Sequence, residues 1–150
     1  MSRESWDHYF MRMAFNAATR STCLRLKVGS VLVQSNSVRG TGYNGAPSGI
    51  QSCLDEGECL MHNNHCIRSV HAEANCILQT DAQERKEATV YVTDLPCWNC
   101  SLLLANSGIS EIVYCNDYGP TKERTEELFL SAGITLRQFE IEPEHRIKDI

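Results

Sequence analysis

Residues 89–114 read TVYVTDLPCWNCSLLLANSGISEIVY and carry the strongest structural signal in the chain. The β-branched run at 89–93 predicts a strand, residues 97–106 predict a helix that Gly108 ends, and residues 111–114 predict a second strand. Further helices and strands of the same alternation are expected at residues 71–80, 120–132 and 135–139. Helices that alternate with strands in this way indicate an α/β layer fold with parallel neighbouring strands.

The first part of the chain predicts a helix followed by a β-hairpin. Aromatic and apolar residues recur at helical spacing over residues 5–20. Two strands at 28–33 and 38–43 flank a short turn at Asn36, and the Gly, Pro and Asn residues of 44–49 then break regular structure. We therefore expect a mixed five-stranded sheet, made of this hairpin and the parallel strands and flanked by helices.

Length and charge limit the kinds of partner. The 150 residues suffice for one domain, which we place at residues 1–140, with a polar C-terminal tail at 141–150. The net charge of −5 argues against a broad basic face for nucleic acid. No apolar run approaches the ~18 residues of a membrane span, and the N-terminus shows no secretory signal. We therefore expect a cytoplasmic protein (or one of a host cytoplasm, if viral) without nucleic-acid or membrane partners.

The eight cysteines indicate metal ligation rather than disulfides if the compartment is reducing. Cys97 and Cys100 lie at the start of a predicted helix, at a spacing that lets two thiolates bind one metal ion. His71 begins another helix and would complete a three-ligand zinc site whose fourth position stays open for water, as in catalytic sites. Glu73 would then take and return a proton. A plain zinc knuckle, with Glu73 as a solvated helix residue, is the alternative.

The order His-x-Glu and then Pro-Cys-x-x-Cys is the pattern of zinc nucleobase deaminases. Over nearly its whole length, from Ser5 to about Phe139, the chain resembles the deoxycytidylate (dCMP) deaminases, a family with the three-layer α/β/α cytidine deaminase-like fold. The zinc motif indicates only the superfamily, whereas the Arg-Ser-Thr-Cys and Gly-Tyr-Asn-Gly segments narrow the resemblance to the nucleotide enzymes. The matching segments are residues 20–23, 28–29, 42–45, 66–68, 71–73 with Asn75, 91–93, 96–100 and Tyr118.

The resemblance implies a role for each matching site residue. His71, Cys97 and Cys100 would hold zinc, and Glu73 would move the proton. Asn44 would meet the sugar and help to place the base. The residues that would hold the 5′-phosphate are Ser21, Arg25 and Tyr118. An arginine fork with two hydroxyls is chemically suited to a phosphate, whereas a plain surface charge is the alternative for Arg25.

A second zinc is expected because further soft ligands lie in or beside residues 44–69, a segment without clear periodicity. Similar family members carry a structural zinc here, with a ligand set that varies. The expected ligands are Cys23, Cys53, Cys59 and Cys66, with His65 as a substitute. Free buried thiols are the alternative. Cys76 and Cys115 are expected in the hydrophobic core.

The resemblance also implies a reaction and its regulation. The reaction would be hydrolytic deamination of dCMP to dUMP and ammonia, which supplies dUMP for dTMP synthesis. The enzyme would be a homohexamer activated by dCTP with Mg²⁺ and inhibited by dTTP, with residues 42–49 as the effector loop. Deaminases of the same fold that act on tRNA adenosine or in pyrimidine biosynthesis, and a non-catalytic zinc module, are the alternatives. Whether dCTP is also a substrate stays open.

Overall fold

The structure is a computed structural model that describes residues 2–117 and 119–146. Its centre is a mixed five-stranded sheet with the strand order β2-β1-β5-β6-β7. The pairs β1–β2 and β1–β5 are antiparallel, and the pairs β5–β6 and β6–β7 are parallel. The strands are β1 (Gly29–Gln34), β2 (Ser37–Tyr43), β5 (Thr89–Asp94), β6 (Glu111–Asn116) and β7 (Thr135–Gln138). The predicted mixed sheet, a hairpin joined to parallel strands, is confirmed.

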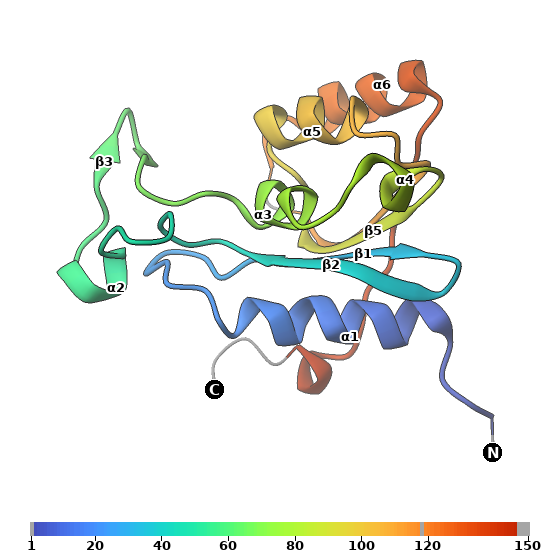
Figure 1. The fold of residues 1–150 in the computed structure, drawn as a ribbon, viewed down its shortest axis with the longest axis horizontal. Helices are drawn as coiled ribbons and strands as arrows, with labels where there is room; N and C mark the ends of the chain where they lie inside the picture. Colours follow the sequence, from blue (N-terminus) through green and yellow to red (C-terminus); the bar gives the residue numbers. More distant parts are fainter. Residues whose placement is uncertain (1, 118, 147–150) are drawn as a thin grey trace.

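Helices cover both faces of this sheet, as Figure 1 shows. Helix α1 packs on one face, and α3, α5 and α6 lie on the other. The helices are α1 (Trp6–Ala18), α3 (Ala72–Leu78), α4 (Ala82–Arg85), α5 (Trp98–Ala105) and α6 (Lys122–Ala132). The result is the three-layer α/β/α architecture that the sequence predicted. Helix α3 stops at Leu78, and the short helix α4, which the sequence analysis did not predict, follows it.

The sheet separates two hydrophobic cores because side chains alternate between the two faces of a strand. Val90 and Val92 of β5 pack with Leu104 of α5 and Phe129 of α6. Tyr91, between those valines, faces the opposite way and packs against α1. The predicted core cysteines follow the same division: Cys76 belongs to the first core and Cys115 to the second.

One close approach places helix α3 on the hairpin. A Cβ atom built on Gly42 of β2 would lie 2.1 Å from the carbonyl oxygen of Ala72 and 2.6 Å from the amide nitrogen of Cys76. Only glycine lets the backbones of β2 and α3 come this close. The contact fixes the first turn of α3, which contains Glu73 and directly follows His71.

Residues 44–70 contain short elements that the sequence analysis did not predict. Helix α2 (Cys53–Glu56) begins with a capping box made by Ser52 and Asp55. Strands β3 (Met61–His62) and β4 (His65–Cys66) then form a small hairpin, which projects beyond the end of the main sheet in Figure 1. These elements bring the cysteines of the segment together.

The chain beyond residue 140 is part of the folded domain, which corrects the expected tail. Ile141 is 4% exposed and packs in the core beside α1. The 3₁₀ helix η1 (Pro143–His145) follows, with His145 Nδ1 3.0 Å from His8 Nε2. Arg146 donates a hydrogen bond to Asn116 Oδ1 at 3.1 Å. Residues 141–146 are therefore not a polar tail, and residues 147–150 lie outside the described residues.

Candidate active site

The structure brings His71, Cys97 and Cys100 together. His71 directly precedes α3, Cys97 directly precedes α5, and Cys100 lies in the first turn of α5. His71 Nδ1 lies 3.4 Å from Cys97 Sγ and 3.3 Å from Cys100 Sγ, and the three ligand atoms lie within 4.8 Å of one another. Tetrahedral zinc with bonds of about 2.0–2.3 Å would separate its ligand atoms by about 3.5 Å. The three side chains therefore fit a zinc ion in both chemistry and spacing.

Electrostatics at this centre favour a thiolate. The pKa of Cys97 lies well below its ordinary value. The larger cause is the hydrogen bond with the Cys100 thiol, and the hydrogen bond with His71 is a smaller one. The same contact with Cys97 raises the pKa of Cys100, so the remaining proton stays on Cys100. The N-terminus of α5 adds a favourable dipole for negative charge. Because zinc binds thiolates, these effects prepare Cys97 for the metal, whereas Cys100 would have to release its proton when zinc binds.

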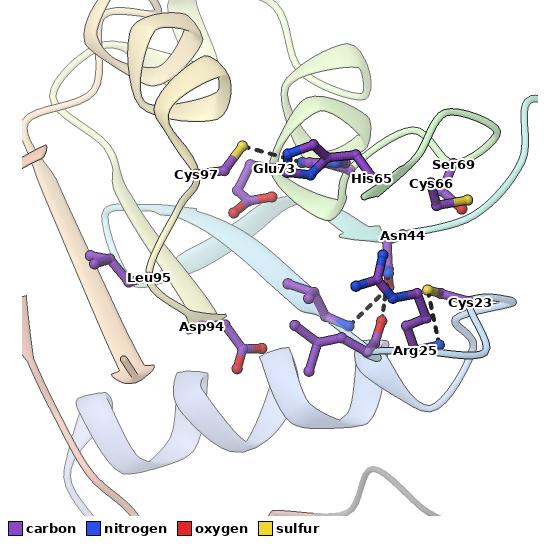
Figure 2. A pocket seen from close by; sticks show the side chains of 13 residues that line it. Cys23, Arg25, Asn44, His65, Cys66, Ser69, Glu73, Asp94, Leu95 and Cys97 are labelled. Atoms are coloured by element: carbon purple, nitrogen blue, oxygen red, sulfur yellow. Dashed lines mark hydrogen bonds between the residues drawn. The ribbon is translucent and has the colours of Figure 1, made fainter. Parts of the chain in front are cut away.

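Glu73 lies beside this centre on the second residue of α3. Its side chain is 4% exposed, and burial raises the pKa of its carboxyl group to about 7. Figure 2 shows the carboxylate on the same side of the pocket as Cys97. A group with a pKa near neutrality can both accept and donate a proton at physiological pH, which is the requirement for a proton shuttle.

A cavity of about 380 Å³ opens in front of these residues. It is lined by Glu73, His71 and Cys97, and Asp94 and Arg25 line it as well. A second hollow of about 740 Å³ shares His71, Asp94 and Cys97 with the first, so the two form one groove. This size lies in the range of small-molecule sites.

The predicted phosphate residues have different positions. Arg25 lines the cavity, and its Nη1 atom donates to the carbonyl oxygen of Asn64 at 3.2 Å. Ser21 is buried, is not among the residues that line the cavity, and accepts a hydrogen bond from the amide of Cys23 at 3.2 Å. Tyr118 lies outside the described residues. Of the two that the structure describes, Arg25 is the residue that lines the cavity.

Asn44 lines the cavity, but its side-chain amide already holds the loop before β1. Its Nδ2 atom donates to the Leu26 carbonyl oxygen at 2.7 Å, and its Oδ1 atom accepts the Val28 amide at 2.9 Å. Leu26 and Val28 themselves line the cavity. Asn44 therefore shapes the wall of the cavity through these two residues, and its expected contact with a sugar stays a prediction.

Three of the four ligands expected for a second zinc lie together. Cys53, Cys59 and Cys66 have their sulfur atoms within 4.8 Å of one another, and the sulfur atoms of Cys53 and Cys66 are 3.5 Å apart. Cys23 is not in this group: it lines the cavity, and its sulfur accepts the Arg25 amide at 3.4 Å. His65 is exposed at the cavity.

Asp94 is a cavity residue that the sequence analysis missed. Its exposed fraction is 5%, and it ends β5 three residues before Cys97. The sequence did contain a signal that Asp94 belongs to the site. A polar residue at the carboxyl end of a parallel strand lies at the edge where such sheets bind ligands. The sequence analysis ended the predicted strand at residue 93 and assigned Asp94 neither to an element nor to the site.

Comparison with known proteins shows the family of the chain. The sequence model of the family described as "Cytidine and deoxycytidylate deaminase zinc-binding region" matches residues 4–116, which is most of the chain. The chain belongs to this family. It is 45% identical over 125 residues to the deoxycytidylate deaminase of Mycobacterium phage D29, covering 76% of this chain and 97% of that protein. It is 42% identical over 144 residues to ComE operon protein 2 of Bacillus subtilis, covering 95% of this chain and 75% of that protein.

Solved structures share the family fold. The dCMP deaminase from the cyanophage S-TIM5, in complex with dCMP and dUMP, matches with a TM-score of 0.73 at 22% identity, covering 93% of this chain and 100% of that one. The predicted resemblance to the zinc-dependent deaminases and to their fold is thus confirmed. Over residues 2–117 and 119–146, every helix of the deaminase is too short or too polar to span a bilayer.

Proposed function

We propose that this deaminase hydrolyses dCMP to dUMP and ammonia. The observation that carries the proposal is a buried carboxylate, Glu73, beside a histidine and two cysteines in a cavity that Arg25 also lines. This combination offers a proton shuttle, a metal site and a cation for a phosphate in one place. The names of the phage relatives, which are deoxycytidylate deaminases, support dCMP as the substrate.

Each residue has a distinct part in the proposed reaction. Zinc held by His71, Cys97 and Cys100 would act as a Lewis acid that lowers the pKa of water. Glu73 accepts a proton from the attacking water and delivers it to N3 of the cytosine ring. Glu73 then takes the proton of the new C4 hydroxyl and transfers it to the leaving amine as the C4–N4 bond breaks, so that one water is consumed and one ammonia is released. The protein thereby replaces the amino group at C4 with an oxygen.

Other residues have proposed roles in binding the nucleotide and a second metal ion. Arg25 binds the 5′-phosphate with Ser21 and Tyr118, and Asn44 contacts the sugar. Cys53, Cys59 and Cys66 hold a second, structural zinc, with Cys23 or His65 as the fourth ligand. The spacing of the three sulfur atoms supports this metal site.

Assembly and regulation complete the proposal. The enzyme is a homohexamer that dCTP with Mg²⁺ activates and dTTP inhibits, with residues 42–49 as the effector loop. Large exposed apolar side chains support an interface on the helical layer, since Leu78 is 79% and Leu130 is 82% exposed. The proposed activity belongs to a cytoplasm, that of the cell or of a viral host. There its product dUMP feeds dTMP synthesis.

Ammonia release from dCMP, dCTP, deoxycytidine and cytidine tests the proposal. We expect fast release from dCMP and slow release from the two nucleosides, because only the nucleotides carry a phosphate for Arg25. The dCTP reaction shows whether the site accepts a longer phosphate chain. Release from adenosine in tRNA but not from dCMP would contradict the proposal.

A further inference from the structure

Asp94 is a buried carboxylate that the proposed mechanism does not use. Its side chain is 5% exposed and lines both hollows of the groove. Placing an ionised carboxylate in such a position costs free energy unless donors surround it. A buried carboxylate beside this cavity therefore indicates either a role in ligand recognition or a structural hydrogen-bond network.

Neighbouring donors hold the carboxylate in one orientation. The amide of Asn116, its partner in the β5–β6 ladder, donates to Asp94 Oδ1 at 3.2 Å. The hydroxyl of Thr93 donates to Oδ2 at 2.5 Å. Arg146 donates to the Oδ1 atom of Asn116 at 3.1 Å and so orients that amide. An ionised carboxylate offers about four lone-pair sites, so a carboxylate that neighbouring groups orient can also accept a donor from a bound ligand.

Figure 2 shows the charged residues of the cavity, Glu73, Arg25 and Asp94, apart from one another. Cys97 and Glu73 lie on one side, Cys23 and Arg25 on a second, and Asp94 on a third. A mononucleotide also has three parts that diverge from its sugar: the base, the 5′-phosphate and the 3′-hydroxyl. The metal side suits the base and the cationic side suits the phosphate. In that arrangement the side with Asp94 is available to the sugar.

We infer that Asp94 accepts a hydrogen bond from the 3′-hydroxyl of the nucleotide and restricts the enzyme to free mononucleotides. The inference rests on the proposed function. The base and sugar of dCMP carry two hydrogen-bond donors, the N4 amine and the 3′-hydroxyl. The amine is the leaving group and must lie at Glu73, so the hydroxyl is the donor that remains for Asp94. A phosphate at the 3′ position, as in any internal nucleotide of a polynucleotide, would instead be repelled.

The test compares substrates that differ only at the 3′ position. Rates are measured for dCMP, for 2′,3′-dideoxycytidine 5′-monophosphate and for deoxycytidine 3′,5′-bisphosphate, with the zinc-loaded wild type. We expect kcat/KM to fall about ten- to a hundredfold when the hydroxyl is absent, as for one charge-assisted hydrogen bond. We expect a larger fall for the bisphosphate.

Variants assign these effects to the carboxylate. In Asp94→Ala the ratio of dCMP to the dideoxy substrate should approach one, and Asp94→Asn should turn over the bisphosphate better than the wild type does. Glu127→Gln, which removes one exposed carboxylate from α6, should leave both ratios at the wild-type value.

The outcomes separate this inference from the proposed function. Equal rates for dCMP and the dideoxy substrate in the wild type would overturn the role of Asp94, and this result needs no variant to fold. A wild-type preference that survives in both Asp94 variants would show that the carboxylate is structural, which also overturns it. Absence of any dCMP turnover by the wild type would overturn the proposed function itself.

Discussion

Burial of the Glu73 side chain is the residue-scale property on which the proposed chemistry depends. Glu73→Gln keeps the shape of the side chain but removes its titratable proton. We expect kcat to fall by about 10²–10⁴-fold, towards the upper end because the same group serves several proton transfers. Elemental analysis should find unchanged zinc in the variant. A variant that kept a tenth of normal activity would contradict the proton-shuttle role.

The proposed phosphate contact of Arg25 gives a second residue-scale test, because dCMP carries a phosphate and deoxycytidine does not. Arg25→Ala should lower kcat/KM for dCMP about ten- to a hundredfold and leave the slow reaction of deoxycytidine nearly unchanged. Arg85→Ala provides the control, since Arg85 lies on α4 and donates to the carbonyl oxygens of Thr80 and Ser107. Its loss should affect the two substrates equally. An equal effect of Arg25→Ala on both substrates would place the phosphate elsewhere.

At the scale of elements, we expect helix α2 and the β3–β4 hairpin to depend on metal binding by Cys53, Cys59 and Cys66. Both elements are short, and metal binding would provide the stabilisation that a small core cannot. We expect two zinc ions per chain in the wild type and one in Cys59→Ser, with faster amide hydrogen exchange confined to residues 50–69. Cys115→Ala, a buried cysteine of the core, should keep both ions. Two ions per chain in Cys59→Ser would rule out its role as a ligand.

At the scale of the whole molecule, one ion-pair network joins α1 to three strands. Asp7 accepts hydrogen bonds from Tyr91 at 2.6 Å and from Arg137 at 2.7 and 2.8 Å, and Arg137 also donates to Glu111 at 3.0 Å. The hydrogen bonds from Arg137 hold the pKa of Asp7 below its ordinary value. The network therefore links the helix before the sheet to strands β5, β6 and β7.

This lowered pKa predicts the pH dependence of stability. A carboxyl group whose pKa is lower in the folded state stabilises the protein fully above its unfolded pKa of about 3.9, and the contribution is lost as the pH falls through the folded value. Asp7→Asn should reduce the free energy of unfolding by about 1–2 kcal/mol at pH 7, because solvent partly screens the network. In urea denaturation at pH 3 the difference should shrink. A constant difference from pH 7 to pH 3 would contradict the assignment.

Local patterns were enough to predict much of this molecule. The strands and the larger helices follow from periods of two and 3.6 residues, which depend only on neighbouring residues. The α/β layer class follows from the alternation of those elements along the chain. The spacing of Cys97 and Cys100 on one helical turn, and of Glu73 after His71, likewise needs no distant partner. Because both helices begin at one edge of the sheet, the metal centre could be predicted from two short motifs.

Other features depend on residues that are far apart in the sequence. Arg25 meets Asn64, Asp94 enters the cavity, Cys23 stays outside the Cys53–Cys59–Cys66 group, and Ile141 returns to the core beside α1. No local period encodes such contacts, because they depend on how loops cross the ends of the sheet and on which surfaces remain to be buried. The sequence therefore predicts the metal ligands, and the packing of loops around them forms the wall of the cavity.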